Sequence, residues 1–247
     1  MIPIKSDEEL KMFEKSGRIL ARVMGGLRRA VKSGISTIEI DLLAQEMMER
    51  EGSSSAFKGY NGFPANICVS VNEEVVHGIP GERVLKDGDM VSLDVGINYK
   101  GYLSDSAITV AVGRIDPARK KLIEVTRRSL IEGIKQARID NYMSDISHAI
   151  QSYVERNGFS VVRQFVGHGI GYDLHEEPQI PNFGKPNRGE ILKKGMLLAI
   201  EPMVNMGAWE CELLDNGWTA VTKDGLPSAH FEHTVAVTER GPRILTD

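Results

Sequence analysis

The sequence has few of the features that mark a disulfide-stabilised protein or a membrane protein. Its 247 residues include only two cysteines, Cys68 and Cys211, which form no C-x-x-C pair. This scarcity excludes a zinc ribbon and a disulfide framework, and it agrees with a reducing compartment. No run of about 18 apolar residues occurs, and residues 1–9 are too polar for a signal peptide. We therefore expect a soluble, unprocessed, cytoplasmic protein without a membrane partner.

An excess of positive charge is also absent. Thirty Lys and Arg residues stand against 34 Asp and Glu residues. Because a basic surface is what binds a phosphate backbone, nucleic acid is not an expected partner. The composition is that of a globular protein, with 41% apolar and 26% charged residues. The length fits one large domain or two fused halves, and composition leaves both open.

Helix signals are clear in both halves of the chain. Ser6 and Ser36 each begin an S-x-x-E capping box, and Asp116-Pro117 combines an N-cap residue with proline at the first helical position. Helices are predicted over about residues 7–32, from Ser36 to Gly52, from Asp116 onward and over about 143–157.

Strand signals follow each helix pair. Residues 66–71 alternate as a half-buried strand does, and residues 90–97 with 102–112 are typical of a hairpin that turns at 98–101. The chain after residue 158 is rich in strands, with turns at 215–217 and 223–225. The expected fold class is therefore α+β.

The two halves echo each other in the same order. Four segments of the first half match four of the second: 49–52 with 155–158, 76–79 with 167–170, 85–94 with 192–201, and 105–110 with 232–237. Matches in one order indicate a duplicated helix-helix-strand unit. We therefore expect one pseudo-twofold domain, with repeats over about residues 7–113 and 116–247, whose acids and histidines converge on the axis.

Asp94 and Asp105 lie on the two strands of the predicted hairpin. With Tyr99-Lys100 as the loop they would be directly opposed, and with Lys100-Gly101 they would be diagonal neighbours on one face. Either way two carboxylates come together, which destabilises a sheet by up to about 1 kcal/mol. A bound cation would explain why an apolar strand carries such a residue.

The second half offers three more candidate ligands. Glu201 follows the apolar run 197–200, Glu232 lies in an apolar strand, and His168 stands between glycines. Four carboxylates and one imidazole suit two divalent ions such as manganese, iron, cobalt or zinc, and suit magnesium less well. Two ions about 3.5–4 Å apart can hold a bridging hydroxide and polarise a carbonyl. The residues therefore favour a metal-dependent hydrolase.

In this order, the five residues resemble the metal ligands of the type I methionine aminopeptidases. The motifs that carry the resemblance are Gly-His-Gly-Ile-Gly (167–171), His-Glu-Glu-Pro (175–178), Ile-Glu-Pro-Met-Val (200–204) and Phe-Glu-His-Thr (231–234). The resemblance covers nearly the whole chain and implies the duplicated pita-bread fold. It implies that Asp94 chelates one ion, that His168 and Glu201 bind the other, and that Asp105 and Glu232 bridge the two.

The resemblance also implies roles in the reaction. His77 corresponds to a histidine that contacts the scissile peptide nitrogen, and His175 to one that steadies the tetrahedral oxyanion. Glu201 would in addition shuttle a proton from the nucleophilic water.

A side-chain pocket is implied in the same way. Tyr60, Phe63, Cys68 and Trp218 match positions that enclose the methionine thioether, and such a wall suits a polarizable side chain. The sequence departs from the family at Leu174, where an aromatic residue is frequent, and at Asn61, where some relatives have histidine. Leu174 puts the width of the pocket in question.

Other polar residues have simpler interpretations. His148 and His230 are expected to be structural or solvated, and His233 to pack on the strand face opposite Glu232. The glycines of 167–171 lack the spacing of a dinucleotide loop, and no G-x-S-x-G motif occurs. A cysteine in an alternating strand, as Cys68 is, more often packs than attacks a substrate.

These observations predict an aminopeptidase with two divalent ions that removes the initiator methionine from nascent proteins and prefers a small second residue. The expected partners are N-termini of nascent polypeptides, with possible ribosome association, and the expected state is a monomer. One alternative is an Xaa-Pro dipeptidase of the same fold, which typically has an extra N-terminal domain, whereas this chain passes directly from Met1 into its first helix. A second is a noncatalytic pita-bread scaffold that binds peptides. A type II enzyme would have a helical insertion between His175 and Glu232.

Overall fold

A computed structural model gives the arrangement of residues 2–247. The four predicted helices are present as α1 (Asp7–Ala30), α2 (Thr37–Arg50), α3 (Pro117–Ile134) and α4 (Met143–Arg156). Both serine capping boxes form, and the Asp116 side chain accepts a hydrogen bond from the Arg119 amide at the start of α3. None of the helices within residues 2–247 has the length and apolar character that a membrane crossing requires.

The strands form one nine-stranded sheet and two small sheets. Along the main sheet the order is β1 (Ser54–Ser55), β4 (Met90–Tyr99), β5 (Tyr102–Ala111), β14 (Glu232–Thr238), β9 (Leu197–Ile200), β7 (Gly167–Gly169) and β8 (Glu176–Ile180), with β2 (Cys68–Val71) on β4 and β15 (Gly241–Ile244) on β14. The small sheets are β13 (Ser228–His230), β10 (Met203–Asn205) and β6 (Ser160–Val161), and β11 (Cys211–Leu213), β12 (Ala220–Thr222) and β3 (Glu74–Val76). A short 3-10 helix, η1, covers Tyr60–Gly62.

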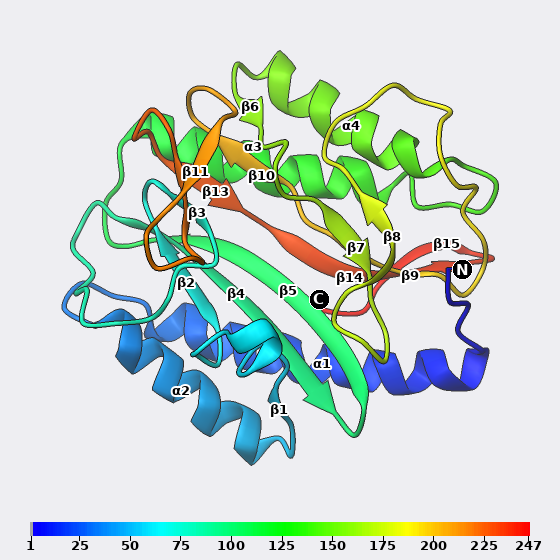
Figure 1. Ribbon diagram of the computed structural model, residues 1–247, viewed down its shortest axis with the longest axis horizontal. Coiled ribbons are helices and arrows are strands. Elements are labelled where there is room, and N and C mark those ends of the chain that lie inside the picture. The colour runs from blue at the N-terminus through cyan, green and yellow to red at the C-terminus, as the bar shows by residue number, and fades with distance from the viewer. Residues whose placement is uncertain (1) are drawn as a thin grey trace.

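The curved main sheet lies between the two helix pairs in projection, with α1 and α2 along one border and α3 and α4 along the other (Figure 1). Apolar residues at every second position of the strands explain this arrangement, because they point to the same face. On β4 the residues Val91, Leu93, Val95 and Ile97 pack in one core with α1 and α2. On β14 the residues Val235 and Val237 pack in a second core with α3 and α4. The helices therefore cover one face of the antiparallel sheet, which makes the fold α+β.

The β4–β5 register decides between the two predicted hairpin loops. Tyr99 pairs with Tyr102, so the loop is Lys100-Gly101, and both loop residues have positive φ, 56° and 87°. This is the backbone that a two-residue type I′ turn requires. Asp94 then pairs with Ala107, and Asp105 pairs with Gly96. The two aspartates are diagonal neighbours on one face.

The prediction of a half-buried strand over 66–71 is wrong in one respect. All four residues of β2 are buried, including Cys68 at 4% and Ser70 at 3% exposure. Val69 and Val71 pack on the core with α1 and α2, and on the other face Cys68 packs in a cluster with Phe57 and Phe63. There the Ser70 hydroxyl accepts a hydrogen bond from the Gly78 amide. The alternation in the sequence therefore separates two buried faces.

Equivalent contacts recur in the two helix pairs. In α2 the Gln45 amide donates to Glu49, and in α4 the Gln151 amide donates to Glu155. The loop before α2 pairs Ser36 with Val84 and the loop before α4 pairs Tyr142 with Ile191, both as antiparallel bridges. Each pair has the same spacing along the chain as the nearby matched segments, 49–52 with 155–158 and 85–94 with 192–201.

Candidate active site

The strand register gathers the predicted ligands in two neighbouring rows. In the first row Asp94 of β4 pairs with Ala107 of β5, and Ala107 pairs with Glu232 of β14. Cys68 of β2 pairs with Asp94 from the other side. Paired residues of neighbouring strands point to the same face. The first row therefore places two acids and a thiol on the face away from the helices, with only an alanine between the acids.

The second row lies two residues along the same face. His168 of β7 pairs with Ala199 of β9, which pairs with Thr234 of β14. The Thr234 hydroxyl accepts from the Asp105 amide and donates to the Asp105 carbonyl, at 2.9 and 2.8 Å. This row therefore carries Asp105 at one end and His168 at the other, with small side chains between them.

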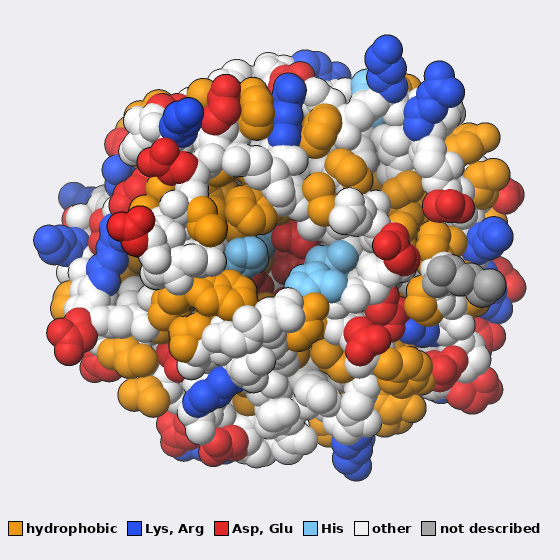
Figure 2. Space-filling view, viewed as in Figure 1, with side chains coloured by type: hydrophobic (Ala, Val, Ile, Leu, Met, Phe, Trp, Pro, Cys, Tyr) orange, Lys and Arg blue, Asp and Glu red, His pale blue; other side chains and the backbone are white. Residues whose placement is uncertain are grey.

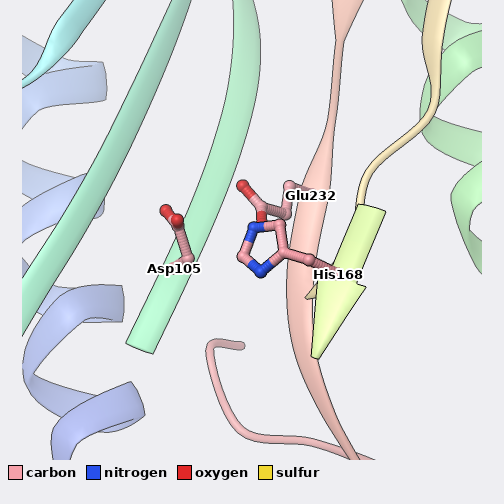
Figure 3. Close-up of side chains that lie close together, drawn as sticks. All are labelled: Asp105, His168 and Glu232. Carbon is pink, nitrogen blue, oxygen red and sulfur yellow. The ribbon is translucent and has the colours of Figure 1, made fainter. Parts of the chain in front are cut away.

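Asp105, His168 and Glu232 converge on one point. Each offers a ligand atom, and these atoms all lie within 4.8 Å of one another. Figure 3 shows the three side chains pointing toward a common space from three different strands. Glu201, which follows β9, joins them, because its Oε1 atom lies 3.5 Å from His168 Nε2. The structure thus brings all five predicted ligands to one cavity.

His168 has a defined orientation. Its Nδ1 atom lies 2.8 Å from the Gly169 carbonyl oxygen, which can only accept a hydrogen bond. The Nδ1 proton is therefore fixed there, and Nε2 faces the acids with its lone pair. Burial lowers the pKa of His168 to about 3, so the ring is neutral. A neutral imidazole oriented by a carbonyl is the usual form of a metal-binding histidine.

The acids are crowded and incompletely paired. Asp105 and Glu232 are buried, and burial raises the pKa of all four carboxyl groups. The neighbouring carboxylates raise the pKa of Asp94, Glu201 and Glu232 further. Within residues 2–247, the buried oxygens Asp94 Oδ1, Asp105 Oδ1 and Glu232 Oε1 have no hydrogen-bond partner. A bound cation would stabilise buried carboxylates that have no donors, so these residues fit a divalent metal.

Two more histidines stand at the cavity. The His175 Nδ1 atom lies 2.7 Å from the Tyr60 hydroxyl, and the His175 ring packs edge-on against His168 at 4.3 Å between centroids. His77 follows β3 with a φ of 60°, and burial lowers its pKa to about 4. A Cβ atom at Gly78 would clash with the Val69 carbonyl, so glycine is needed there for His77 to reach the site.

The cavity has an apolar wall beside the acids. Its volume is about 350 Å³, and the predicted pocket residues Tyr60, Phe63, Cys68 and Trp218 all line it, as do Asn61 and Leu174. The Phe63 and Trp218 rings meet edge-on at 5.1 Å. Figure 2 shows the opening, with histidine on two sides, acids at its floor and apolar side chains around it.

A larger cavity of about 1170 Å³ opens on the helix-covered face, but it contains none of the predicted site residues. His233 lines it, with Nδ1 2.8 Å from the Thr246 hydroxyl. This confirms that His233 packs on the face opposite Glu232. His148 is exposed and contacts the Gly184 carbonyl. The 350 Å³ cavity is the better candidate because it holds the convergent acids and imidazoles.

Among the residues near the site that were given no role from the sequence, Phe165 and His230 contact predicted site residues directly. The Phe165 ring packs edge-on against His77 at 5.5 Å, and only its place shortly before His168 could have indicated it. His230, which was expected to be structural or solvated, is buried with its Nε2 atom 3.4 Å from Glu201 Oε2. The sequence held one signal for His230. It stands two residues before Glu232, and alternate residues of a strand point to the same face.

Comparison with known proteins agrees with this geometry. Residues 11–239 match the model of metallopeptidase family M24. The chain is 54% identical to methionine aminopeptidase 1 of Bacillus subtilis and 52% identical to a methionine aminopeptidase of Clostridium perfringens, over 100% of this chain and 99% of each relative. It superimposes on the crystal structure of a methionine aminopeptidase from Thermotoga maritima with a TM-score of 0.98, at 46% identity and complete coverage of both chains. The chain therefore belongs to metallopeptidase family M24 and, within it, to the methionine aminopeptidases with the pita-bread fold.

Proposed function

We propose that this chain removes N-terminal methionine from nascent polypeptides, using two divalent ions held by Asp94, Asp105, His168, Glu201 and Glu232. The observation that carries the proposal is the set of buried acids whose unpartnered oxygens share a cavity with neutral imidazoles. Crowded carboxylates do not stabilise a fold by themselves, so their burial favours a catalytic explanation.

In this proposal Asp94, Asp105, His168, Glu201 and Glu232 would together hold the two ions. When bound, such ions lower the pKa of water and polarise a peptide carbonyl. Four carboxylates and one imidazole suit manganese, iron, cobalt or zinc.

His175 would steady the negative oxygen of the tetrahedral intermediate. The Tyr60 hydroxyl, 2.7 Å from Nδ1, can donate to that atom and leave the ring proton on Nε2. An Nε2–H group facing the cavity is the donor that a developing oxyanion needs. His77 would contact the peptide nitrogen, and Glu201 would carry a proton from the attacking water toward that nitrogen.

Tyr60, Phe63, Cys68 and Trp218 would enclose the methionine side chain. They place aromatic rings and a sulfur atom on one wall of the cavity, a surface that suits a thioether. Leu174 is 4% exposed and lines the same cavity. A small residue after the methionine is part of the same proposal.

We further propose that residues 1–247 form one catalytic domain with duplicated units over about residues 7–113 and 116–247. The matched glutamine–glutamate pairs of α2 and α4 support it, as do the matched bridges before them. Neither half would hold the site alone, because Asp94 and Asp105 come from the first unit and the other three ligands from the second.

An Xaa-Pro dipeptidase is less favoured, because relatives that match this chain over its full length are named methionine aminopeptidases. A noncatalytic scaffold is less favoured because all five candidate ligands reach one cavity. A monomeric state, a cytoplasmic location and ribosome association stay predictions.

The test is release of methionine from Met-Ala-Ser by chelator-treated protein before and after addition of manganese, cobalt, iron or zinc. Met-Leu-Ser and Ala-Pro serve as matched substrates. Cleavage of Met-Ala-Ser alone, restored by metal, supports the proposal and its small second residue. Cleavage of Ala-Pro instead would indicate the dipeptidase, and absence of cleavage with every metal would favour the scaffold.

A further inference from the structure

His230 is a buried imidazole that the proposed mechanism does not use. It ends β13 and is 1% exposed. Its backbone is fixed at both polar groups, because the amide donates to the Thr109 hydroxyl at 2.8 Å and the carbonyl accepts from the same hydroxyl at 2.9 Å. The Thr109 hydroxyl also contacts the Ser92 hydroxyl at 2.9 Å. The ring therefore projects from a firmly held strand end.

The Glu201 carboxylate lies between two imidazoles. Its Oε1 atom is 3.5 Å from His168 Nε2, and its Oε2 atom is 3.4 Å from His230 Nε2. Within residues 2–247, His230 Nε2 has no hydrogen-bond partner. A buried ring nitrogen without a partner is unfavourable, and an imidazole can place a proton on Nε2 in either protonation state. A small rotation of the Glu201 carboxylate would complete this bond.

We propose that His230 is a positioning residue that donates from Nε2 to Glu201 Oε2 and thereby holds Oε1 toward His168 and the metal site. The inference rests on the proposed function. His230 does not line the cavity, so it acts through Glu201. Groups that hydrogen-bond a metal-binding carboxylate orient it, and their loss typically costs about 10- to 100-fold in metal affinity.

A purely structural role for His230 is the competing explanation. Variants whose side chains differ in length distinguish it from the positioning role. In His230→Gln the amide nitrogen falls close to the position of Nε2, so the donor is retained. In His230→Asn the same amide is one methylene too short to reach Glu201. Asn also leaves a larger gap than Gln at this buried position, so His230→Met, which fills the volume without a donor, shows whether a loss comes from the missing donor or from packing. His233→Asn is the matched control, because it removes an imidazole on the opposite face.

The experiment measures cobalt affinity by calorimetry, the visible absorption of bound cobalt, the melting temperature without metal, and kcat and KM for Met-Ala-Ser. We expect His230→Asn to bind cobalt about 10- to 100-fold more weakly and to change the absorption. His230→Gln should stay within threefold of wild type, and His233→Asn should bind cobalt as wild type does. If His230→Asn does not fold, His230→Met tests the same loss, since it fills the volume without a donor.

Wild-type affinity in the Asn variant would overturn the inference, and so would equal weakening in the Gln and Asn variants. Both results leave the proposed function intact, because wild-type protein would still bind cobalt and cleave Met-Ala-Ser. Wild-type protein that neither binds cobalt nor cleaves this substrate would overturn the proposed function, and the inference with it.

Discussion

The two faces of the main sheet carry different side chains from the same strands. On β4 the face toward α1 and α2 presents Val91, Leu93, Val95 and Ile97, and the other face presents Ser92, Asp94 and Gly96. The helix-covered face contributes apolar packing. The face away from the helices, called the open face below, gathers carboxylates that repel one another. This difference indicates that the packing against the helix pairs lies on one face and the chemistry on the other. Substitutions on the two faces should therefore separate stability from activity.

The largest effect on activity is expected on the open face. Glu232→Ala removes a proposed bridging carboxylate, so kcat/KM for Met-Ala-Ser should fall by at least about 100-fold and metal affinity should fall with it. The metal-free melting temperature should stay the same or rise, because one buried carboxylate without a donor is gone. Kinetics, calorimetry and thermal unfolding measure the three quantities. Glu239→Ala, at an exposed glutamate, is the control, and full activity in Glu232→Ala would contradict the two-ion mechanism.

The reverse result is expected on the helix-covered face. Ile97 is fully buried beneath α1 and α2. Ile97→Ala should lower the free energy of unfolding by about 2–5 kcal/mol, and Ile97→Val by about 0.5–1.5 kcal/mol. Urea denaturation measures the loss, and kcat of the folded protein should stay within about twofold of wild type, since stability and site lie on separate faces. A large fall in kcat without a fall in stability would contradict this separation.

A smaller effect is expected at the apolar wall of the open face. Trp218→Ala removes an aromatic ring that packs on Phe63, so KM for Met-Ala-Ser should rise by up to about tenfold, because a contact between sulfur and an aromatic ring contributes about 0.3–1.5 kcal/mol. The value of kcat should change less, because the metal ligands remain. Trp209, the other tryptophan of the chain, packs under Arg163 and does not line the cavity. Trp209→Ala should leave KM unchanged, and an equal rise in both variants would count against the proposed methionine pocket.

The sequence was sufficient to predict structure where the determining contacts are local. The capping boxes at Ser6 and Ser36 predict where α1 and α2 begin, because their hydrogen bonds are made within four residues. The hairpin pattern placed Asp94 and Asp105 on one face but left two loops open. Both loops contain Lys100, so the choice depended on whether Tyr99 or Gly101 is the other loop residue, and Gly101 takes that place with a positive φ. The register followed from that loop.

Contacts between distant segments were beyond local rules. Residues 66–71 alternate as a half-buried strand does, yet Ser70 is buried, and its hydroxyl accepts a hydrogen bond from Gly78 on the segment that follows β3. His230 received no role because its spacing of two from Glu232 does not show that its ring reaches Glu201, which follows the distant strand β9. The roles of His77 and His175 came from the resemblance, since neither residue has a local pattern that indicates catalysis.

The smallest effect is expected where α1 reaches from the helix layer to the open face. Glu9 accepts hydrogen bonds from the Ser6 amide and from the Tyr172 hydroxyl, both at 2.6 Å, and Tyr172 lies three residues before His175. These bonds, led by Ser6, lower the pKa of Glu9 from 4.5 to about 2. The folded protein therefore favours the ionised form, so this stabilisation is complete above pH 4.5 and is lost as the pH falls through 2.

Glu9→Gln keeps the shape but removes the charge and one of the two acceptors, because the amide nitrogen cannot accept a hydrogen bond. Because Glu9 is largely solvated, the variant should be less stable by about 1 kcal/mol or less at pH 6. The difference from wild type should shrink as the pH falls from 4.5 toward 2, because wild-type Glu9 then becomes neutral as well. Urea denaturation at several pH values measures it, with Glu8→Gln as the first-turn control. A difference that stays constant down to pH 2 would show that the Glu9 charge does not link α1 to the loop before His175.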